Sequence, residues 1–417
     1  EIASCLVGSE MCIRDRIMLS AASRPYIDAS VPVLREHGLA ITKAFYQNLF
    51  ISHPQLHNIF NAGNQASGVQ QQSLASAVFA YAANIDNPSA LAPVISRIVH
   101  KHVSLGVTAE HYPIVGEHLL GAIKQVLGDA ATPELIAAWA EAYGILADAL
   151  INEEKRLYQQ AGINPGDLFE MKVTAVDQES EQVRSFTFSP NDGSPSPSFR
   201  PGQYVSVAVH LPNGLRQLRQ YSLSDAPDHR HLRISVKREV AGAETPAGMV
   251  SNWLHDNVTV GSILSVSKPF GDFVPDTDSD APIVLLSAGV GITPMISALN
   301  RIAYVAPHRR VIFAHAARNA RHHPHRADIE KAVARMPNLQ SVTFYEEADT
   351  AHVGDAVQPG RMQLKKLPQW DVANTNVYLC GPLPFMQAQW ADLVASGVPV
   401  KNLHREVFGP DMLDHLI

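Results

Sequence analysis

The sequence contains few cysteines, no long apolar run and no excess of positive charge. Its 417 residues include only Cys5, Cys12 and Cys380, and none of these forms a Cys-x-x-Cys pair. This pattern excludes a zinc knuckle and a disulfide framework and favours a reducing, cytoplasmic setting. No apolar run approaches the ~20 residues that a membrane-spanning helix requires. The net charge of -7 argues against a nucleic-acid partner.

The length of the chain predicts two or three domains, because single hydrophobic cores rarely grow beyond about 250–300 residues. A hydrophobic content of 46% is sufficient to build such cores. Residues 1–17 do not fit this organisation. In a secretory signal peptide, positive charge precedes the apolar stretch, whereas Arg14 and Arg16 follow it here. We interpret residues 1–17 as a non-native extension and expect natural translation to start at Met18.

Residues 18–160 have the apolar spacing of helices. Thr132-Pro133-Glu134 is typical of a helix start, with a capping hydroxyl, a proline at the first position and an acid in the first turn. The apolar stripe that follows consists of Leu135, Trp139, Ala142, Leu146 and Leu150. Glu154 continues this stripe, so its carboxylate lies either just beyond the buried zone or paired inside it.

A second helical stripe ends in a histidine, before an expected stop at Gly106. This stripe consists of Ile95, Ile98, Val99 and His102. A histidine on an apolar face is either a hydrogen-bonded core residue or a metal ligand. His100 is the rival ligand, but it points about 200° round the helix from His102. We interpret His100 as a surface residue.

Residues 168–275 change to a two-residue period, in short runs separated by Pro, Asn, Asp and Gly. This pattern predicts an antiparallel sheet that closes into a small barrel. Residues 161–167 form a linker by composition. Arg219-Gln220-Tyr221-Ser222 ends one run. Its Arg could hold a diphosphate and its Tyr could stack on an isoalloxazine ring, but the same residues also suit an ordinary strand end.

Residues 281–417 alternate strand and helix patterns, which predicts a parallel sheet with helices on both faces. The candidate strands are 283–288, 310–315, 341–346 and 376–380, and the candidate helices are 294–304, 326–335 and 384–395. Three histidines lie close together in residues 321–326. Because this segment contains a proline and no carboxylate or cysteine, we interpret it as a solvated loop and not as a metal site.

The stretch Gly289-Val290-Gly291-Ile292-Thr293-Pro294 follows an apolar strand. Two glycines at a strand-to-helix turn let the backbone approach a pyrophosphate, although such turns also occur without a ligand. The third glycine of the usual dinucleotide fingerprint is missing. This departure argues against an ordinary dehydrogenase.

Short motifs in the helical third support a more specific interpretation. They are Ala44-Phe45-Tyr46, Ile59-Phe60-Asn61, Gln70-x-x-x-Leu74, Lys101-His102, Tyr112-x-Ile-Val-Gly-Glu-His-Leu-Leu and Ala142-Tyr143-Gly144. With them, nearly all of residues 20–158 resembles the globin domain of bacterial flavohemoglobins.

This resemblance implies a role for each matching residue. His102 would be the proximal ligand of a haem iron, with Tyr112 and Glu154 hydrogen-bonded on the same side. Tyr46 and Gln70 would lie on the distal side, where a hydroxyl and an amide can donate hydrogen bonds to O2. The haem pocket would also contain Phe60 and Leu74.

The rest of the chain carries a second set of motifs. They are Pro201-Gly202-Gln203-Tyr204, Arg219-Gln220-Tyr221-Ser222, the segment 248–254, Gly-x-Gly-x-Thr-Pro at 289–294, Cys380-Gly381-Pro382 and Glu406-Val407-Phe408-Gly409-Pro410. Together they resemble the ferredoxin–NADP reductase superfamily.

The reductase resemblance implies two binding sites. FAD would contact Tyr204, Arg219, Gln220, Tyr221, Ser222, Gly248, Val250, Ser251, Val407, Phe408, Gly409 and Pro410. NAD(P)H would contact Gly289, Val290, Gly291, Ile292, Thr293, Pro294, Cys380, Gly381 and Pro382. Cys380 would then serve the geometry of hydride transfer and not act as a nucleophile. Lys101 and Glu406 would be a charged pair near the flavin–haem junction.

Residues 18–410 as a whole are similar to a bacterial flavohemoglobin. The resemblance implies an all-α globin at 18–160, an antiparallel β-barrel FAD domain at 168–275 and an α/β parallel-sheet NAD(P)H domain at 281–417. It also implies nitric oxide dioxygenase activity with haem b, FAD and NADH or NADPH. The alternatives are an NAD(P)H-driven haem reductase of NO or alkyl hydroperoxides, and an oxygen or redox sensor. We expect a monomer whose partners are O2, NO and NAD(P)H.

Overall fold

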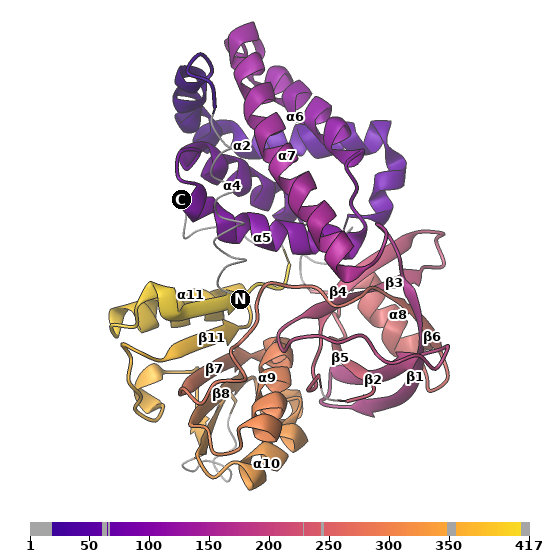
Figure 1. The fold of residues 1–417 in the computed structure, drawn as a ribbon, viewed down its shortest axis with the longest axis vertical. Coiled ribbons are helices and arrows are strands. Elements are labelled where there is room, and N and C mark those ends of the chain that lie inside the picture. The colour runs from indigo at the N-terminus through magenta and orange to yellow at the C-terminus, as the bar shows by residue number, and fades with distance from the viewer. Residues whose placement is uncertain are drawn as a thin grey trace. The chain divides into compact units, whose positions relative to one another are not determined.

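The computed structural model describes residues 19–60, 65, 67–227, 229–242, 246–347 and 356–409 (Figure 1). Its elements fall into two compact units. The first consists mainly of residues up to Asp167, and the second of Leu168–Gly214 together with Arg219–Gly409. Residues 1–17, predicted to be non-native, lie outside the described residues, and so does Pro410.

The first unit is helical where it is described up to Asp167. Its elements are α2 (Arg24–Ser52), the 3-10 helix η1 (Pro54–Asn58), α4 (Val69–Ala83), α5 (Pro88–Leu105), α6 (His111–Leu127), the 3-10 helix η2 (Gly128–Ala130) and α7 (Pro133–Ala161). The predicted start of α7 is confirmed, because the Thr132 hydroxyl accepts a hydrogen bond from the Leu135 N–H at 3.2 Å. The predicted stop of α5 is also confirmed. Gly106 follows α5 with a φ of 79°, which a residue without a Cβ adopts at little cost.

The second unit begins with an antiparallel sheet. Its elements are β1 (Phe169–Gln178), β2 (Val183–Pro190), β3 (Tyr204–His210), β4 (Arg216–Ser222), β5 (Leu232–Lys237), α8 (Met249–Asn257) and β6 (Ile263–Val266). The strand order is β4-β3-β6-β1-β2-β5. A bridge between Leu223 and Ile234 joins the two outer strands, as expected of a small barrel. Alternate side chains such as Phe186 and Phe188 fill its interior.

The second unit continues with a parallel sheet. Its elements are β7 (Ile283–Ala288), η3 (Gly289–Gly291), α9 (Ile292–Val305), β8 (Val311–Ala317), η4 (Ala320–His322), α10 (Arg326–Arg335), β9 (Leu339–Tyr345), β10 (Val357–Pro359), η6 (Leu364–Lys366), β11 (Asn376–Cys380), α11 (Leu383–Ala395), η7 (Val400–Asn402) and β12 (Leu403–Glu406). The order is β10-β9-β8-β7-β11-β12, and neighbouring strands run parallel. Ile296 of α9 and Ile329 of α10 belong to one core, and Leu393 of α11 belongs to another. The prediction of helices on both faces is therefore confirmed.

The prediction of a solvated loop at residues 321–326 is wrong. His323 and His325 are 3% and 0% exposed. The Tyr345 hydroxyl lies 2.9 Å from His323 Nδ1, and the Ser235 hydroxyl lies 2.8 Å from His325 Nε2. These partners come from distant strands, so the local composition could not predict them.

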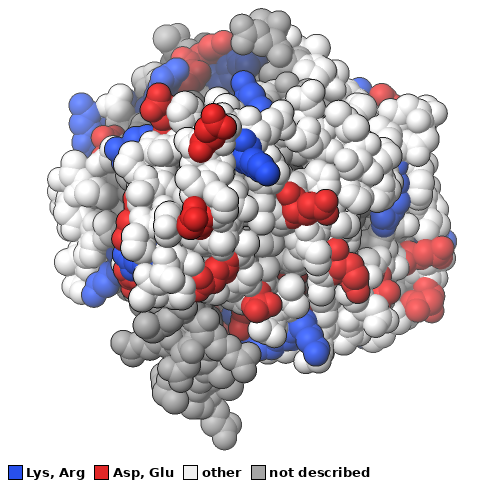
Figure 2. Space-filling view, turned by 90° about the horizontal axis from the view of Figure 1, so that it is seen from above, with Lys and Arg blue, Asp and Glu red and all other residues white. Residues whose placement is uncertain are grey.

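Charged side chains of both signs are interspersed on the face that Figure 2 shows. Within the described ranges, no helix is both long and apolar enough to cross a membrane.

Candidate functional site

In the first unit, a carboxylate and a phenol hold the His102 ring. His102 Nδ1 lies 2.7 Å from Glu154 Oε1 and 3.1 Å from the Tyr112 hydroxyl oxygen. The Tyr112 hydroxyl donates to the same Glu154 oxygen at 2.5 Å. Helices α5, α6 and α7 each supply one member of this triad. Because Glu154 is 3% exposed, its carboxylate is paired inside the buried zone and does not lie beyond it.

The triad determines which nitrogen of His102 can act as a ligand. A carboxylate accepts only from a protonated nitrogen, so Nδ1 carries the proton and the lone pair is on Nε2. Burial, and after it the charge of Glu154, raises the pKa of Tyr112, which keeps its hydroxyl a donor. In the part of the chain that the structure describes, both hydrogen-bond contacts of His102 are at Nδ1, and 32% of its side chain is exposed. A basic, accessible nitrogen on a ring held by a carboxylate fits a ligand of haem iron.

The rival histidine is His100. It is half-buried, as His102 is, and lies two residues from His102 on the same helix. The Glu154–Tyr112 pair engages the His102 ring. The interpretation of His102 as the ligand therefore keeps its support.

The predicted distal residues gather around Tyr46 of α2, which is 4% exposed. Burial raises the pKa of Tyr46 to about 12, with smaller lowering effects from the side chains of Gln70 and Gln65. The phenol proton is thus retained. The Phe60 ring meets the Tyr46 ring edge-on, with centroids 5.6 Å apart. Leu74 of α4 is half-buried.

The sequence interpretation missed Gln65. It lies five residues before Gln70 and outside the helical pattern, so no periodicity indicated it. Gln65 Oε1 also accepts a hydrogen bond from Gln71 Nε2 of α4 at 3.0 Å.

In the second unit, the predicted FAD residues are brought together around β4 and the start of α8. Arg219 and Tyr221 project from the same face of β4, and burial lowers the pKa of Arg219. Burial raises the pKa of Tyr221; the charge of Arg219 lowers it to a smaller extent, and that of Glu239 raises it. The Glu239 carbonyl in turn accepts from the Gly248 N–H at 2.9 Å. Glu239 was missed because it follows the strand run and belongs to none of the motifs, and its contact with Gly248 is remote in the local pattern.

The start of α8 also fits an anion. Gly248 precedes the helix, and no side chain among the described residues caps it. A Cβ at Gly248 would lie 2.6 Å from Ser251 Oγ and 2.9 Å from Glu239 Cβ, so the close approach requires glycine. Val250 and Ser251 are 2% and 8% exposed. A half-buried arginine together with an uncapped helix start suits the phosphates of FAD.

The remaining predicted FAD residues are placed as follows. Tyr204 and Ser222 are 7% and 6% exposed, and Gln220 is half-buried. Phe408 is 45% exposed, so its ring is available to cover a flat ligand. It follows Val407, which is buried, and precedes Gly409, which is exposed. Gly409 has a φ of 107°.

The two predicted nucleotide motifs meet at the ends of β7 and β11. A Cβ at Gly291 would lie 2.5 Å from the Cys380 carbonyl oxygen and 2.7 Å from the Gly381 nitrogen. A Cβ at Gly381 would lie 3.1 Å from Ala288 Cβ. Glycine at both positions therefore lets the two turns touch through their backbones. This joint lies at the carboxyl ends of adjacent parallel strands, where nucleotides bind in such sheets.

The other residues of this turn are enclosed. Ile292, Thr293 and Pro294 are buried at the start of α9, while Val290 is half-buried and Pro382 caps α11. Cys380 is 0% exposed, and burial raises the pKa of its thiol, with Glu406 adding to the effect. The thiol is therefore protonated, which supports a positioning role. Lys101 and Glu406 belong to different units, and their pairing stays a prediction.

Family models match three segments of the chain. They are Globin at residues 43–150, Oxidoreductase FAD-binding domain at 170–274 and Oxidoreductase NAD-binding domain at 285–390.

Full-length relatives preserve this order. The flavohemoprotein of Bordetella parapertussis is 49% identical over 94% of this chain and 99% of its own. The flavohemoprotein of Bacillus subtilis is 41% identical over 95% and 98%. A flavohemoglobin from Malassezia yamatoensis, solved with FAD and haem, superposes with a TM-score of 0.83 at 32% identity over 94% of this chain and 100% of its own. The FAD/NAD-binding domain of a nitric oxide dioxygenase from Vibrio cholerae matches 58% of this chain and 100% of its own, with 37% identity and a TM-score of 0.54.

Proposed function

Because the chain belongs to the flavohemoprotein family, we propose that it is a nitric oxide dioxygenase that converts NO and O2 to nitrate with electrons from NAD(P)H. Haem and FAD are the groups bound in the relative from Malassezia yamatoensis. The His102–Glu154–Tyr112 triad carries the proposal, since it equips one imidazole to bind iron as a strong electron donor.

When bound, haem b would supply the iron at which O2 and NO react, and FAD would convert the hydride of NAD(P)H into single electrons. The residues of the chain would bind and orient these groups. Glu154 accepts the Nδ1 proton of His102 at 2.7 Å and so increases the basicity of Nε2. Tyr112 donates to Glu154 at 2.5 Å and fixes its carboxylate. This arrangement favours oxygen chemistry over simple carriage.

Tyr46 would supply a hydrogen bond on the distal side. Because burial raises its pKa to about 12, the hydroxyl keeps the proton that it would donate to a ligand. Phe60 and Leu74 would complete an apolar wall. A fixed donor aimed at developing negative charge stabilises it without reorganisation.

The second unit would deliver the electrons. Arg219 and the start of α8 would hold the phosphates of FAD, and the Gly291–Gly381 joint would admit the pyrophosphate of NAD(P)H. The buried Cys380 would position the nicotinamide. We further infer three domains, at 18–160, 168–275 and 281–417, and a cytoplasmic monomer. The free thiol of Cys380 suits a reducing compartment.

The experiment is a product assay on the purified chain with haem and FAD. Under O2, NO and NADH should give nitrate, at about two nitrate ions per NADH, because a hydride carries two electrons and each turnover uses one. Without O2, a haem reductase of NO would give nitrous oxide as the main product. NADH consumption that NO does not accelerate under O2 would contradict the proposal and favour a sensor.

A further inference from the structure

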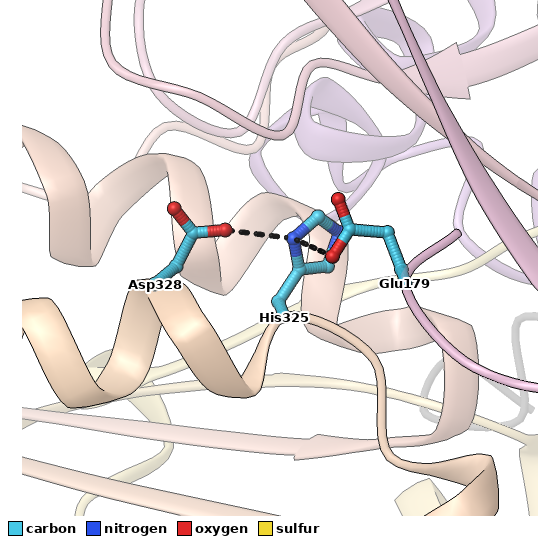
Figure 3. A group of neighbouring side chains, drawn as sticks. All are labelled: Glu179, His325 and Asp328. Atoms are coloured by element: carbon cyan, nitrogen blue, oxygen red, sulfur yellow. Dashed lines mark hydrogen bonds and ion pairs between the residues drawn. The ribbon is translucent and has the colours of Figure 1, made fainter. Parts of the chain in front are cut away.

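Three side chains that the proposed electron path does not use converge in the second unit. Glu179 follows β1 of the barrel, and His325 and Asp328 lie at the start of α10 (Figure 3). His325 Nδ1 lies 2.9 Å from Asp328 Oδ2 and 3.5 Å from Glu179 Oε2. The side chain of His325 is 0% exposed, that of Asp328 is 12% exposed and that of Glu179 is 14% exposed.

We propose that Glu179, His325 and Asp328 bind a divalent transition-metal cation, with Zn²⁺ as the best-matched ion. Zn²⁺ bonds to nitrogen and oxygen at about 2.0–2.2 Å, which places tetrahedral ligand atoms about 3.3–3.6 Å apart. The two observed spacings of 2.9 and 3.5 Å lie close to this value, and all three ligand atoms lie within 4.8 Å of one another. One imidazole and two carboxylates also match the donor preference of Zn²⁺.

The second heteroatom of each ligand is already held. Ser185 Oγ donates to Glu179 Oε1 at 2.7 Å, and Asn300 Nδ2 donates to Asp328 Oδ1 at 3.3 Å. The Ser235 hydroxyl lies 2.8 Å from His325 Nε2. Partners of this kind orient metal ligands. The facing atoms are His325 Nδ1, Glu179 Oε2 and Asp328 Oδ2. Asp328 Oδ2 also accepts from Arg233 at 3.0 Å, so the cation would share or replace that bond.

The charge around the cluster also suits a dication. Arg233 lies 3.0 Å from Asp328 Oδ2, and Asn300 links Asp328 to Asp225. Among the described residues, Arg233 is the one arginine or lysine in an ion pair with Asp328, while Glu179 and Asp225 add further negative charge nearby. A divalent cation would offset this excess of buried negative charge, which is costly when unbalanced.

The backbone at His325 has an unusual conformation. Its φ of 61° makes it the one residue other than glycine with a positive φ among the described residues. This conformation is uncommon for a residue with a Cβ. Strained positions persist where the surroundings over-determine them, often at ligand sites. Here the turn directs the imidazole at Glu179 and Asp328.

The proposed ion would join two parts of the second unit. Glu179 directly follows the barrel strand β1, and α10 packs on the parallel sheet. An ion that binds both would clamp the barrel to the sheet. The clamp is a structural role, separate from the proposed electron path.

The test uses the full chain with haem and FAD, stripped by a chelator and then titrated with Zn²⁺ by calorimetry. The unmodified protein should bind one Zn²⁺ through this cluster. His325→Asn should weaken this binding by at least about 10-fold, since even partners of ligands matter by 10- to 100-fold. Asparagine tolerates a positive φ, so the backbone can be retained. Glu179→Gln should weaken Zn²⁺ binding to a similar extent. If His325→Asn loses its FAD or haem spectrum, the Zn²⁺ affinity of Glu179→Gln is the test of the proposal.

Two control variants each replace a histidine near the cluster. His322→Asn changes the same loop, and His229→Asn changes an exposed histidine 3.7 Å from Asp225. Both should bind Zn²⁺ as the unmodified protein does. Zn-edge X-ray absorption should show nitrogen and oxygen neighbours with a single imidazole. The proposal is overturned if no stoichiometric Zn²⁺ binds, if His325→Asn and Glu179→Gln bind normally, or if sulfur or several imidazoles surround the ion.

Discussion

The candidate haem site is built mainly from side-chain groups, whereas the candidate nucleotide site is built mainly from backbone. The first depends on side-chain groups from separate helices, where Glu154 and Tyr112 fix the ring of His102. The second depends on backbone, where Gly291 lies against the carbonyl of Cys380. A side-chain site should fail when one functional group is removed. A backbone site should fail when an atom is added.

The largest effect is expected from His102→Ala. Removal of the proposed ligand should abolish haem binding, so the Soret band should vanish while flavin absorbance and NADH-driven dye reduction persist. His100→Ala is the matched control on the same helix and should keep its haem. Retention of haem by His102→Ala would show that the ligand has been misassigned.

Gly291→Ala tests the backbone site. The added Cβ would lie 2.5 Å from the Cys380 carbonyl oxygen, so the turn must shift. Displacements of about 1 Å can cost about 100-fold in rate, and kcat/KM of flavin reduction by NADH should fall about that much. Gly121→Ala is the control, because nothing lies within 4 Å of its Cβ position. Stopped-flow flavin reduction at the unmodified rate in Gly291→Ala would contradict a tight backbone joint.

Glu154→Gln tests whether the negative charge beside His102 matters to the candidate haem site. The amide oxygen can still accept from His102 but carries no charge, so haem should remain while nitrate formation falls about 10- to 100-fold. The iron–histidine stretching frequency, measured by resonance Raman spectroscopy, should also fall. Glu153→Gln changes the adjacent carboxylate, which pairs with Arg156 at 2.8 Å, and should alter neither reading. An unchanged frequency in Glu154→Gln would remove the proposed electronic role.

Tyr46→Phe should have a smaller effect. Loss of one hydrogen bond of about 1.4 kcal/mol should speed O2 dissociation about tenfold. Because the pKa of Tyr46 is raised to about 12, its phenol stays protonated across neutral pH and through the ordinary value of 10.0. The contribution of this residue to stability is present below about pH 10 and is lost as the pH rises through about 12. An O2 off-rate that already rises between pH 7 and 9 in the unmodified protein would contradict this assignment.

The smallest effect concerns the thiol of Cys380. Its side chain is 0% exposed, and burial raises its pKa. Iodoacetamide at pH 8 should therefore leave the peptide that contains Cys380 unmodified in the native protein and alkylate it after unfolding. Mass spectrometry of the digest measures both states. Rapid native alkylation would indicate a reactive cysteine.

The sequence predicted most of the fold because its patterns are local. The apolar run at β7 predicted the strand at its observed bounds, and Thr132 marked the start of α7. The short edge strands β10 and β12 were missed, since three or four residues carry too little periodicity. These elements depend on neighbours that are remote in sequence.

The candidate site was predictable where residues form motifs. Gln65 and Glu239 were missed because they act through spatial neighbours, Tyr46 and Gly248. The burial of His325 was missed for the same reason, since Ser235 and Glu179 lie far from it in sequence.

The most direct test of the account is a nitrate assay on three proteins in parallel: the unmodified chain, His102→Ala and Gly291→Ala. We expect nitrate to form from NO, O2 and NADH at full rate only in the unmodified chain. We also expect NADH to reduce the flavin rapidly in His102→Ala but slowly in Gly291→Ala. Rapid nitrate formation by either variant would contradict an electron path that runs from the glycine joint to the His102 triad.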